Sequence, residues 1–195
     1  LSAIQKLVLD NIKSDKNIIA MSKTGSGKTH AFLLPIFNDL IEEEKSCQAV
    51  IVAPTLELAR QIYKVAQHIA SFSPNTITVK AYYGGTDMER EMEKIKSNPP
   101  QIVVATPGKL VDLAIDENIL KIHLAKYFVM DEADMIADSF LEDVFKISEK
   151  FKEAKKMVFS ATIRESLEPL LRKFLSNTIT LEVEKKDVSS LKIEH

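Results

Sequence analysis

Residues 17–29 read Asn-Ile-Ile-Ala-Met-Ser-Lys-Thr-Gly-Ser-Gly-Lys-Thr, and this stretch decides the fold. Its beginning, Asn17–Met21, is a short apolar run bounded by polar residues, a pattern typical of a buried parallel strand. The chain then continues with apolar side chains at helical spacing: Phe32, Leu33, Ile36, Phe37 and Leu40. A strand, a glycine-containing loop and a helix in this order are the context of a phosphate-binding loop.

The loop between this strand and this helix carries groups that bind phosphate. Gly25 and Gly27 let successive backbone N–H groups curl around a phosphate, and the start of the helix adds a partial positive charge. Lys28 supplies a full charge, and Thr29 supplies a hydroxyl that can ligate Mg²⁺. The strict Gly-x-x-x-x-Gly-Lys-Thr spacing would place glycine where the chain has Ser22. A surface turn of this composition is the alternative, but the flanking strand and helix favour a nucleotide-binding loop.

Length and composition fit one globular domain. The chain has 195 residues, 45% of them apolar, which suffices for a single core. No apolar run reaches the length of a membrane span and the start does not look like a cleaved signal, so we expect no membrane partner. The single Cys47 argues against a disulfide framework or a multi-cysteine zinc site, and it fits the reducing cytosol, so the expected location is cytoplasmic. The net charge of −2 leaves nucleic-acid binding to local geometry.

Predicted strands and helices alternate along almost the whole chain. The strands are expected at Asn17–Met21, Gln48–Ala53, Thr76–Tyr82, Ile102–Ala105, Ala125–Met130, Lys156–Phe159 and Ile179–Val183. The helices are expected at Leu1–Ile12, Lys28–Glu44, Leu56–Phe72, Thr86–Lys96, Pro107–Ile115, Asp134–Phe151 and Glu165–Phe174. This alternation predicts an α/β fold with a mainly parallel sheet and helices on both faces. The polar tail Glu184–His195 is expected to leave the core.

Short polar motifs follow most of the predicted strands. In open α/β sheets the ligand binds beyond the carboxyl ends of the strands, so residues at those ends are informative. Any single motif could be a turn or a helix cap, and Asp131–Asp134 alone could be an acidic helix start favoured by the dipole. Together they would line one edge of the sheet beside the phosphate-binding loop. In chain order they are Pro54–Gln61, Gly84 and Gly85, Thr106–Lys109, Asp131–Asp134 and Ser160–Thr162.

This ordered set resembles the first RecA-like domain of a DEAD-box ATP-dependent RNA helicase. The motifs that carry the resemblance are Ser-Lys-Thr-Gly-Ser-Gly-Lys-Thr, Pro-Thr-Leu-Glu-Leu-Ala, Gly-Gly, Thr-Pro-Gly-Lys, Asp-Glu-Ala-Asp and Ser-Ala-Thr. The resemblance covers essentially the whole chain, from the Ser2-Ala3-Ile4-Gln5 segment onward. It implies a RecA-like P-loop NTPase fold and RNA-stimulated ATP hydrolysis coupled to local unwinding of RNA duplexes.

The resemblance also implies roles in a site for ATP and Mg²⁺. Gln5 would read the adenine, Thr29 and Asp131 would hold Mg²⁺, and Glu132 would orient or deprotonate the attacking water. The implied nucleotide-binding residues are Gln5, Ser22, Lys23, Thr24, Gly25, Ser26, Gly27, Lys28 and Thr29. The implied catalytic and coupling residues are Lys28, Asp131, Glu132, Asp134, Ser160 and Thr162, with Asp134 linking the nucleotide site to RNA.

On the RNA side, the resemblance implies contacts with sugar and phosphate at helix N-termini. Such contacts carry little sequence information, so sequence-tolerant binding is expected. Leu56 and Lys109 stand where the family usually has arginine; lysine keeps the charge without the planar fork, and leucine loses both. The implied RNA-binding residues are Pro54, Thr55, Gly84, Gly85, Thr106, Pro107, Gly108 and Lys109.

The family's second RecA-like domain, which completes the ATP site and the RNA surface, has no room after Ser160–Thr162. We therefore expect residues 1–183 to be the first domain, with 184–195 as a tail or linker, cut from a longer protein and monomeric by itself. Two other classes remain open from sequence. One is a DNA helicase or another P-loop ATPase, and the other is an ATP-dependent RNA clamp or assembly platform.

Overall fold

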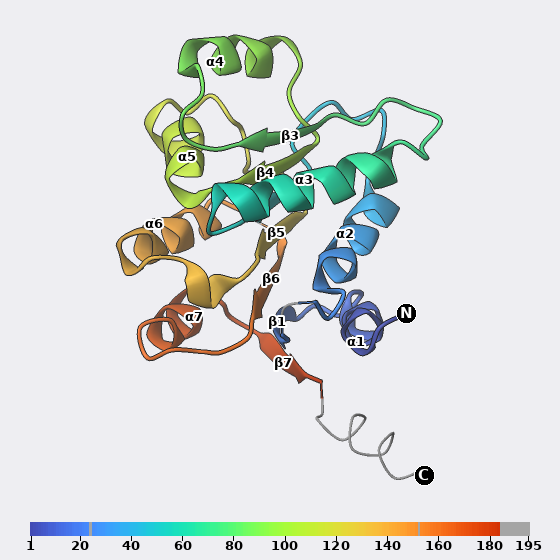
Figure 1. Cartoon of the computed structure of the whole chain (residues 1–195), viewed down its shortest axis with the longest axis vertical. Helices are drawn as coiled ribbons and strands as arrows, with labels where there is room; N and C mark the ends of the chain where they lie inside the picture. Colours follow the sequence, from blue (N-terminus) through green and yellow to red (C-terminus); the bar gives the residue numbers. More distant parts are fainter. Residues whose placement is uncertain (24, 152, 184–195) are drawn as a thin grey trace.

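The computed structural model describes residues 1–23, 25–151 and 153–183, which build a seven-stranded sheet (Figure 1). The strand order is β3-β4-β2-β5-β6-β1-β7, and every recorded pair of neighbours is parallel. The predicted α/β class with a parallel sheet is therefore confirmed. The strands are β1 (Asn17–Met21), β2 (Ala49–Val52), β3 (Val79–Tyr82), β4 (Ile102–Ala105), β5 (Tyr127–Met130), β6 (Lys155–Ser160) and β7 (Thr178–Glu182).

Helices cover both faces of the sheet. One face carries α1 (Ala3–Asn11), α2 (Lys28–Asp39) and α3 (Leu56–Ala70). The other carries α4 (Met88–Ser97), α5 (Pro107–Val111), α6 (Asp138–Ser148) and α7 (Glu168–Phe174). A π-helical turn, Asp112–Asp116, extends α5, and a 3-10 turn, Ala133–Met135, precedes α6. No helix in the described parts of the chain has the length and apolar character needed to cross a membrane.

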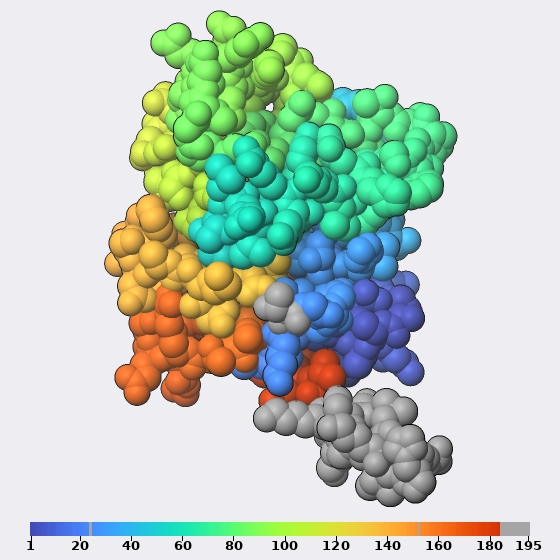
Figure 2. All heavy atoms as spheres, in the orientation of Figure 1, coloured from blue at the N-terminus to red at the C-terminus, as the bar shows by residue number. Residues whose placement is uncertain are grey.

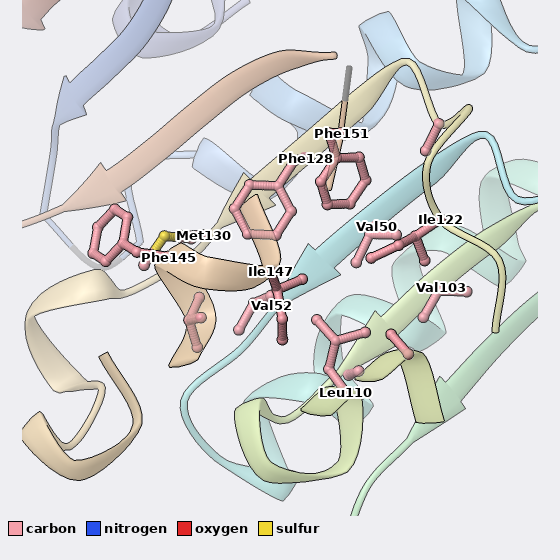
Figure 3. Packing of buried hydrophobic residues seen from close by; sticks show 14 of the residues in the cluster. Val50, Val52, Val103, Leu110, Ile122, Phe128, Met130, Phe145, Ile147 and Phe151 are labelled. Atoms are coloured by element: carbon pink, nitrogen blue, oxygen red, sulfur yellow. The ribbon is translucent and has the colours of Figure 1, made fainter. Parts of the chain in front are cut away.

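The central strands β2, β4 and β5 are buried at every position because all of their residues are apolar. Val50 and Val52 of β2 pack with Phe128 and Met130 of β5 in one core cluster, where α5 and α6 cover them (Figure 3). The alternate residues, such as Ile51, belong to the opposite cluster under α1, α2 and α3. Successive side chains of a strand point to opposite faces, so a continuous apolar run can fill both layers. This double burial holds the ends of the strands in fixed positions.

Several predicted helix boundaries are wrong, although every predicted element exists in the predicted order. The helix expected to reach Glu44 ends at Asp39, and Leu40 is already extended. The side chain of Gln48 explains the early end, because its amide binds the backbone of Ile41 and the carbonyl of Glu44. The helix expected from Asp134 begins only at Asp138, after the 3-10 turn. The tail expected at 184–195 lies outside the described residues.

Candidate functional site

The motifs found in the sequence follow strands that all run in the same direction, so they lie along one edge of the sheet. We call this the carboxyl edge. The strand order divides it into two halves. At the ends of β5, β6 and β1 lie Asp131–Asp134, Ser160–Thr162 and residues 22–29. At the ends of β3, β4 and β2 lie residues 84–85, 106–109 and 54–55.

Residues 22–23 and 25–27 lie between β1 and α2, and Lys28 and Thr29 are the first two residues of α2. Gly25 and Gly27 both have φ of +83°, a left-handed conformation that favours glycine. A Cβ at Gly27 would lie 2.7 Å from Nε2 of Gln5 and 2.9 Å from Oγ of Ser2, so only glycine fits there without displacement. Gln5 donates from Nε2 to the Gly27 carbonyl at 3.0 Å, and its Oε1 accepts from the Ser2 N–H at 3.0 Å. The start of α1 is thereby fixed against this loop.

The remaining loop residues differ in exposure. Lys23 is exposed, whereas Ser22 and the Ser26 hydroxyl are buried. The hydroxyls of Ser22 and Ser26 have no hydrogen-bond partner among the described residues. A buried hydroxyl without a partner is costly unless another group satisfies it, so these atoms are available to a polar ligand. Thr24 lies outside the described residues.

Lys28 meets two carboxylates at the centre of this half. Its ammonium forms an ion pair with Glu132 and lies 3.4 Å from Oδ1 of Asp131. All three side chains are at most 6% exposed. Burial raises the pKa of Asp131, and the nearby Lys28 charge partly opposes that rise. Lys28 is the first residue of α2 and the carboxylates follow β5, so the fold joins groups that are about a hundred residues apart.

Glu132 has a left-handed backbone, with φ of 49° and ψ of 48°. This conformation costs energy for a residue with a side chain, and such strain concentrates at functional sites. Here it directs the Glu132 side chain toward Lys28, while its N–H donates to Oδ1 of Asp131 at 3.0 Å.

A pocket of about 400 Å³ opens between these groups and α3. In Figure 2, α3 (cyan) lies directly above the loop and the start of α2 (blue). The polar lining includes Lys28, Thr29, Asp131 and Glu132, and α3 adds a partly apolar wall: Leu58, Gln61, Ile62 and Val65. The described residues contain no cluster of three or more His, Cys, Asp or Glu side chains placed to hold a metal. A hard cation bound here would have one carboxylate and one hydroxyl as protein ligands, and phosphate and water as the others. Such a ligand set suits Mg²⁺.

Asp134 connects the segments after β5 and β6. Its N–H donates to Oγ of Ser160 at 3.2 Å, and the Thr162 hydroxyl donates to its Oδ2 at 3.2 Å. The Ser160 hydroxyl in turn donates to the Thr162 carbonyl at 2.5 Å. We call these contacts the β5–β6 junction. The structure thus brings together three residues that the sequence analysis grouped for coupling.

The other half of the carboxyl edge presents helix starts and exposed backbone. Thr55 caps α3, since its Oγ1 accepts from the Leu58 N–H at 3.2 Å. Gly84 and Gly85 are exposed, and Thr106 precedes α5. N–H groups at helix starts and in exposed turns suit phosphate oxygens, as an RNA backbone would present. Leu56, which stands where the resembled family usually has arginine, is 37% exposed and adds no charge.

The Lys109 side chain turns inward. It is 7% exposed, its Nζ lies 2.8 Å from Oε1 of Glu91, and it donates to Oγ1 of Thr86 at 3.2 Å. Thr86 also donates to Glu91, at 2.6 Å. In this arrangement Lys109 holds the turn that contains Gly84 and Gly85. Its direct contact with RNA remains a prediction, and its side chain would have to leave Glu91 to make one.

Sequence reasoning missed two arginines at this edge. Arg60 lies 5.2 Å from the centre of the Tyr83 ring, beside the exposed glycines. Arg164 binds the segment after β5 through several donors. Arg60 lies within the stretch Pro54–Gln61 but was given no role there, and Arg164 lies outside every quoted motif, so only the three-dimensional structure reveals their contacts.

Comparisons with known proteins found a matching family model and similar relatives. The model of the family described as DEAD/DEAH box helicase matches residues 2–170. The chain is similar to the DEAD-box ATP-dependent RNA helicase CshB of Listeria monocytogenes, 43% identical over 98% of this chain and 44% of that protein. The ATP-dependent RNA helicase eIF4A of Debaryomyces hansenii is 36% identical over 96% of this chain and 47% of that protein.

A solved structure supports the same relationship. The crystal structure of a DEAD box protein from the hyperthermophile Methanococcus jannaschii superposes with a TM-score of 0.85 at 28% identity. The match covers 95% of this chain and 50% of that one. The chain therefore spans about half the length of the relatives that it matches.

Proposed function

This chain belongs to the DEAD/DEAH box helicase family, and from that premise we propose that residues 1–183 are the ATP-binding first RecA-like domain of an ATP-dependent RNA helicase. The observation that carries the proposal is the arrangement of the carboxyl edge. Lys28, Asp131 and Glu132 converge in one pocket, and Asp134 connects that pocket to the neighbouring segment. We propose that a second RecA-like domain of the same full-length protein completes the site. The proposed location is the cytoplasm, supported by the single, buried Cys47.

The half of the carboxyl edge around Lys28 fits ATP with Mg²⁺. Loop N–H groups would surround the phosphates, Lys28 would neutralise the β- and γ-phosphates, and Thr29 with Asp131 would hold the cation. The cation would offset the phosphate charge that builds up during transfer. Lys28 now lies between two carboxylates, so nucleotide binding requires it to exchange one of them for phosphate. Glu132 would then be free to orient the attacking water.

The other half fits the sugar–phosphate backbone of RNA. Its proposed contacts are Pro54, Thr55, Gly84, Gly85, Thr106, Pro107, Gly108 and Lys109. Backbone N–H groups would do most of the binding, because Leu56 carries no charge and the Lys109 ammonium is paired with Glu91. Such contacts read no bases, so the domain should accept many RNA sequences.

We expect adenine selectivity in the full-length protein. An amide side chain can both donate to and accept from the adenine edge, and Gln5 lies beside the loop with its amide bound to Gly27. Calorimetry should give tighter binding of ADP than of GDP. Equal affinities for ADP and GDP would exclude Gln5 as the residue that reads the base.

Strand separation tests the proposed function. With ATP, the full-length protein should separate a short RNA duplex, and Lys28→Ala should abolish both nucleotide binding and separation. An ATP-dependent clamp would instead retain single-stranded RNA without separating the duplex. Duplex RNA that stays intact while the protein hydrolyses ATP and holds RNA would therefore contradict the helicase assignment.

A further inference from the structure

Arg164, two residues beyond the β5–β6 junction, binds the segment that follows Glu132. One guanidinium nitrogen, Nη1, donates to the Asp134 carbonyl at 2.7 Å, and Nη2 donates to the Ile136 carbonyl. Nη2 also lies 3.1 Å from Oδ1 of Asp138, at the first residue of α6. Nε donates to Oγ of Ser166 at 2.9 Å, and Ser166 donates to the same Asp138 oxygen at 3.0 Å.

The hydrogen bonds of Arg164 to the two carbonyls stabilise this arrangement more than its ion pair with Asp138 does. Asp138 is 71% exposed and the Arg164 side chain is 33% exposed, so their attraction is screened by water and contributes little. Asp134 and Ile136 lie in and after the 3-10 turn, where the backbone cannot continue regular helical hydrogen bonds. A planar guanidinium can serve two such carbonyls at once, in fixed directions.

The segment held by Arg164 begins at Glu132, whose left-handed backbone must be maintained by its surroundings. On one side Asp131 accepts from the Glu132 N–H, and on the other the turn Ala133–Met135 is fixed by Arg164. The β5–β6 junction holds this turn at one residue, Asp134. Arg164 adds a second attachment between the same two segments.

Building on the function proposed above, we propose that Arg164 is a positioning residue for ATP hydrolysis. It holds the 3-10 turn so that Glu132 keeps its orientation, and it makes the segments after β5 and β6 move as one unit. Arg164 is not among the residues that line the pocket around Lys28 and Glu132. Loss of Arg164 should therefore affect turnover rather than nucleotide binding.

The test compares Arg164→Ala with Arg172→Ala in the full-length protein. Arg172 is a matched control, because its exposed guanidinium pairs with Glu168 on the surface of α7. Arg164→Ala should lower kcat for RNA-stimulated ATP hydrolysis about ten- to a hundredfold, since a small displacement near the chemistry can cost about 10²-fold. KM for ATP should stay within about threefold, and Arg172→Ala should change neither constant. Arg164→Lys should recover part of the loss, because an ammonium can serve one carbonyl but lacks the planar fork.

Hydrogen exchange gives a readout that does not depend on catalysis. Amides of residues 131–140 should exchange faster in Arg164→Ala than in Arg172→Ala, while those of β1 stay the same. Unchanged exchange in 131–140, or equal kcat in both alanine variants, would overturn the proposal. A wild-type protein without RNA-stimulated hydrolysis would instead refute the proposed function, and with it the positioning of Glu132 for hydrolysis by Arg164. The exchange data would still decide whether Arg164 holds the turn.

Discussion

Residues 1–195 alone should hydrolyse ATP about 10³–10⁵-fold more slowly than the full-length protein with RNA, the factor by which an arginine from outside a P-loop can raise the rate. Among the described residues that line the pocket, Lys28 is the one lysine or arginine, and it faces two carboxylates. Because no other domain closes the pocket in the isolated chain, water can enter it. The isolated chain should therefore bind ADP or ATP weakly, remain monomeric, and show no strand separation.

Steady-state hydrolysis at saturating RNA measures this difference. The matched comparison is the isolated chain against the full-length protein at equal concentration, with Lys28→Ala of each as the background. RNA-dependent turnover by residues 1–195 at the full-length rate would show that this domain contains a complete catalytic site. It would refute the proposal that a second RecA-like domain completes the site.

Glu132→Gln should lower ATP turnover of the full-length protein by about two orders of magnitude or more, the usual contribution of a positioned general base. The amide keeps the shape of the side chain but cannot accept a proton from water. Nucleotide binding should persist, because Lys28 then loses one of the carboxylates that compete with phosphate for its charge. RNA binding should persist as well. The measurement is kcat together with the affinities for ATP and RNA.

Glu142→Gln serves as the control for this substitution. Glu142 is an exposed residue of α6 that pairs with Lys146 along the same helix, so its change should leave turnover as it was. Near-normal turnover in Glu132→Gln would show that another group orients the attacking water. A loss of ATP affinity equal to the loss of kcat would mean that Glu132 serves binding rather than the chemical step.

Local sequence patterns predicted the strands well where an apolar run had clear ends. Asn17–Met21 and Ile102–Ala105 have the same bounds in the structure as in the sequence analysis. Helix ends were less predictable, because distant side chains set them. The side chain of Gln48 binds the backbone of Ile41 and Glu44, just after the end of α2, and so prevents the helix from continuing. Nothing in the local sequence indicates that contact.

The order of the strands could not be predicted at all, although it determines the site. Strand pairing is non-local, so the sequence indicates that motifs share an edge but not which are neighbours. The structure separates the edge into a half around Lys28 and a half around Gly84 and Gly85. The ion pair of Lys109 with Glu91 was equally hidden, since a motif match assigns a residue type and not a side-chain direction. Arg164 lay outside every motif.

The most direct test of the account is ATP hydrolysis by the full-length protein with no nucleic acid, with single-stranded RNA, and with DNA of the same sequence. We propose that ATP binds the half of the carboxyl edge around Lys28 and an RNA backbone the other half, coupled through Asp134. RNA should therefore raise kcat by at least tenfold, and DNA should not. Hydrolysis that is equally fast with RNA, with DNA and without either would contradict this assignment.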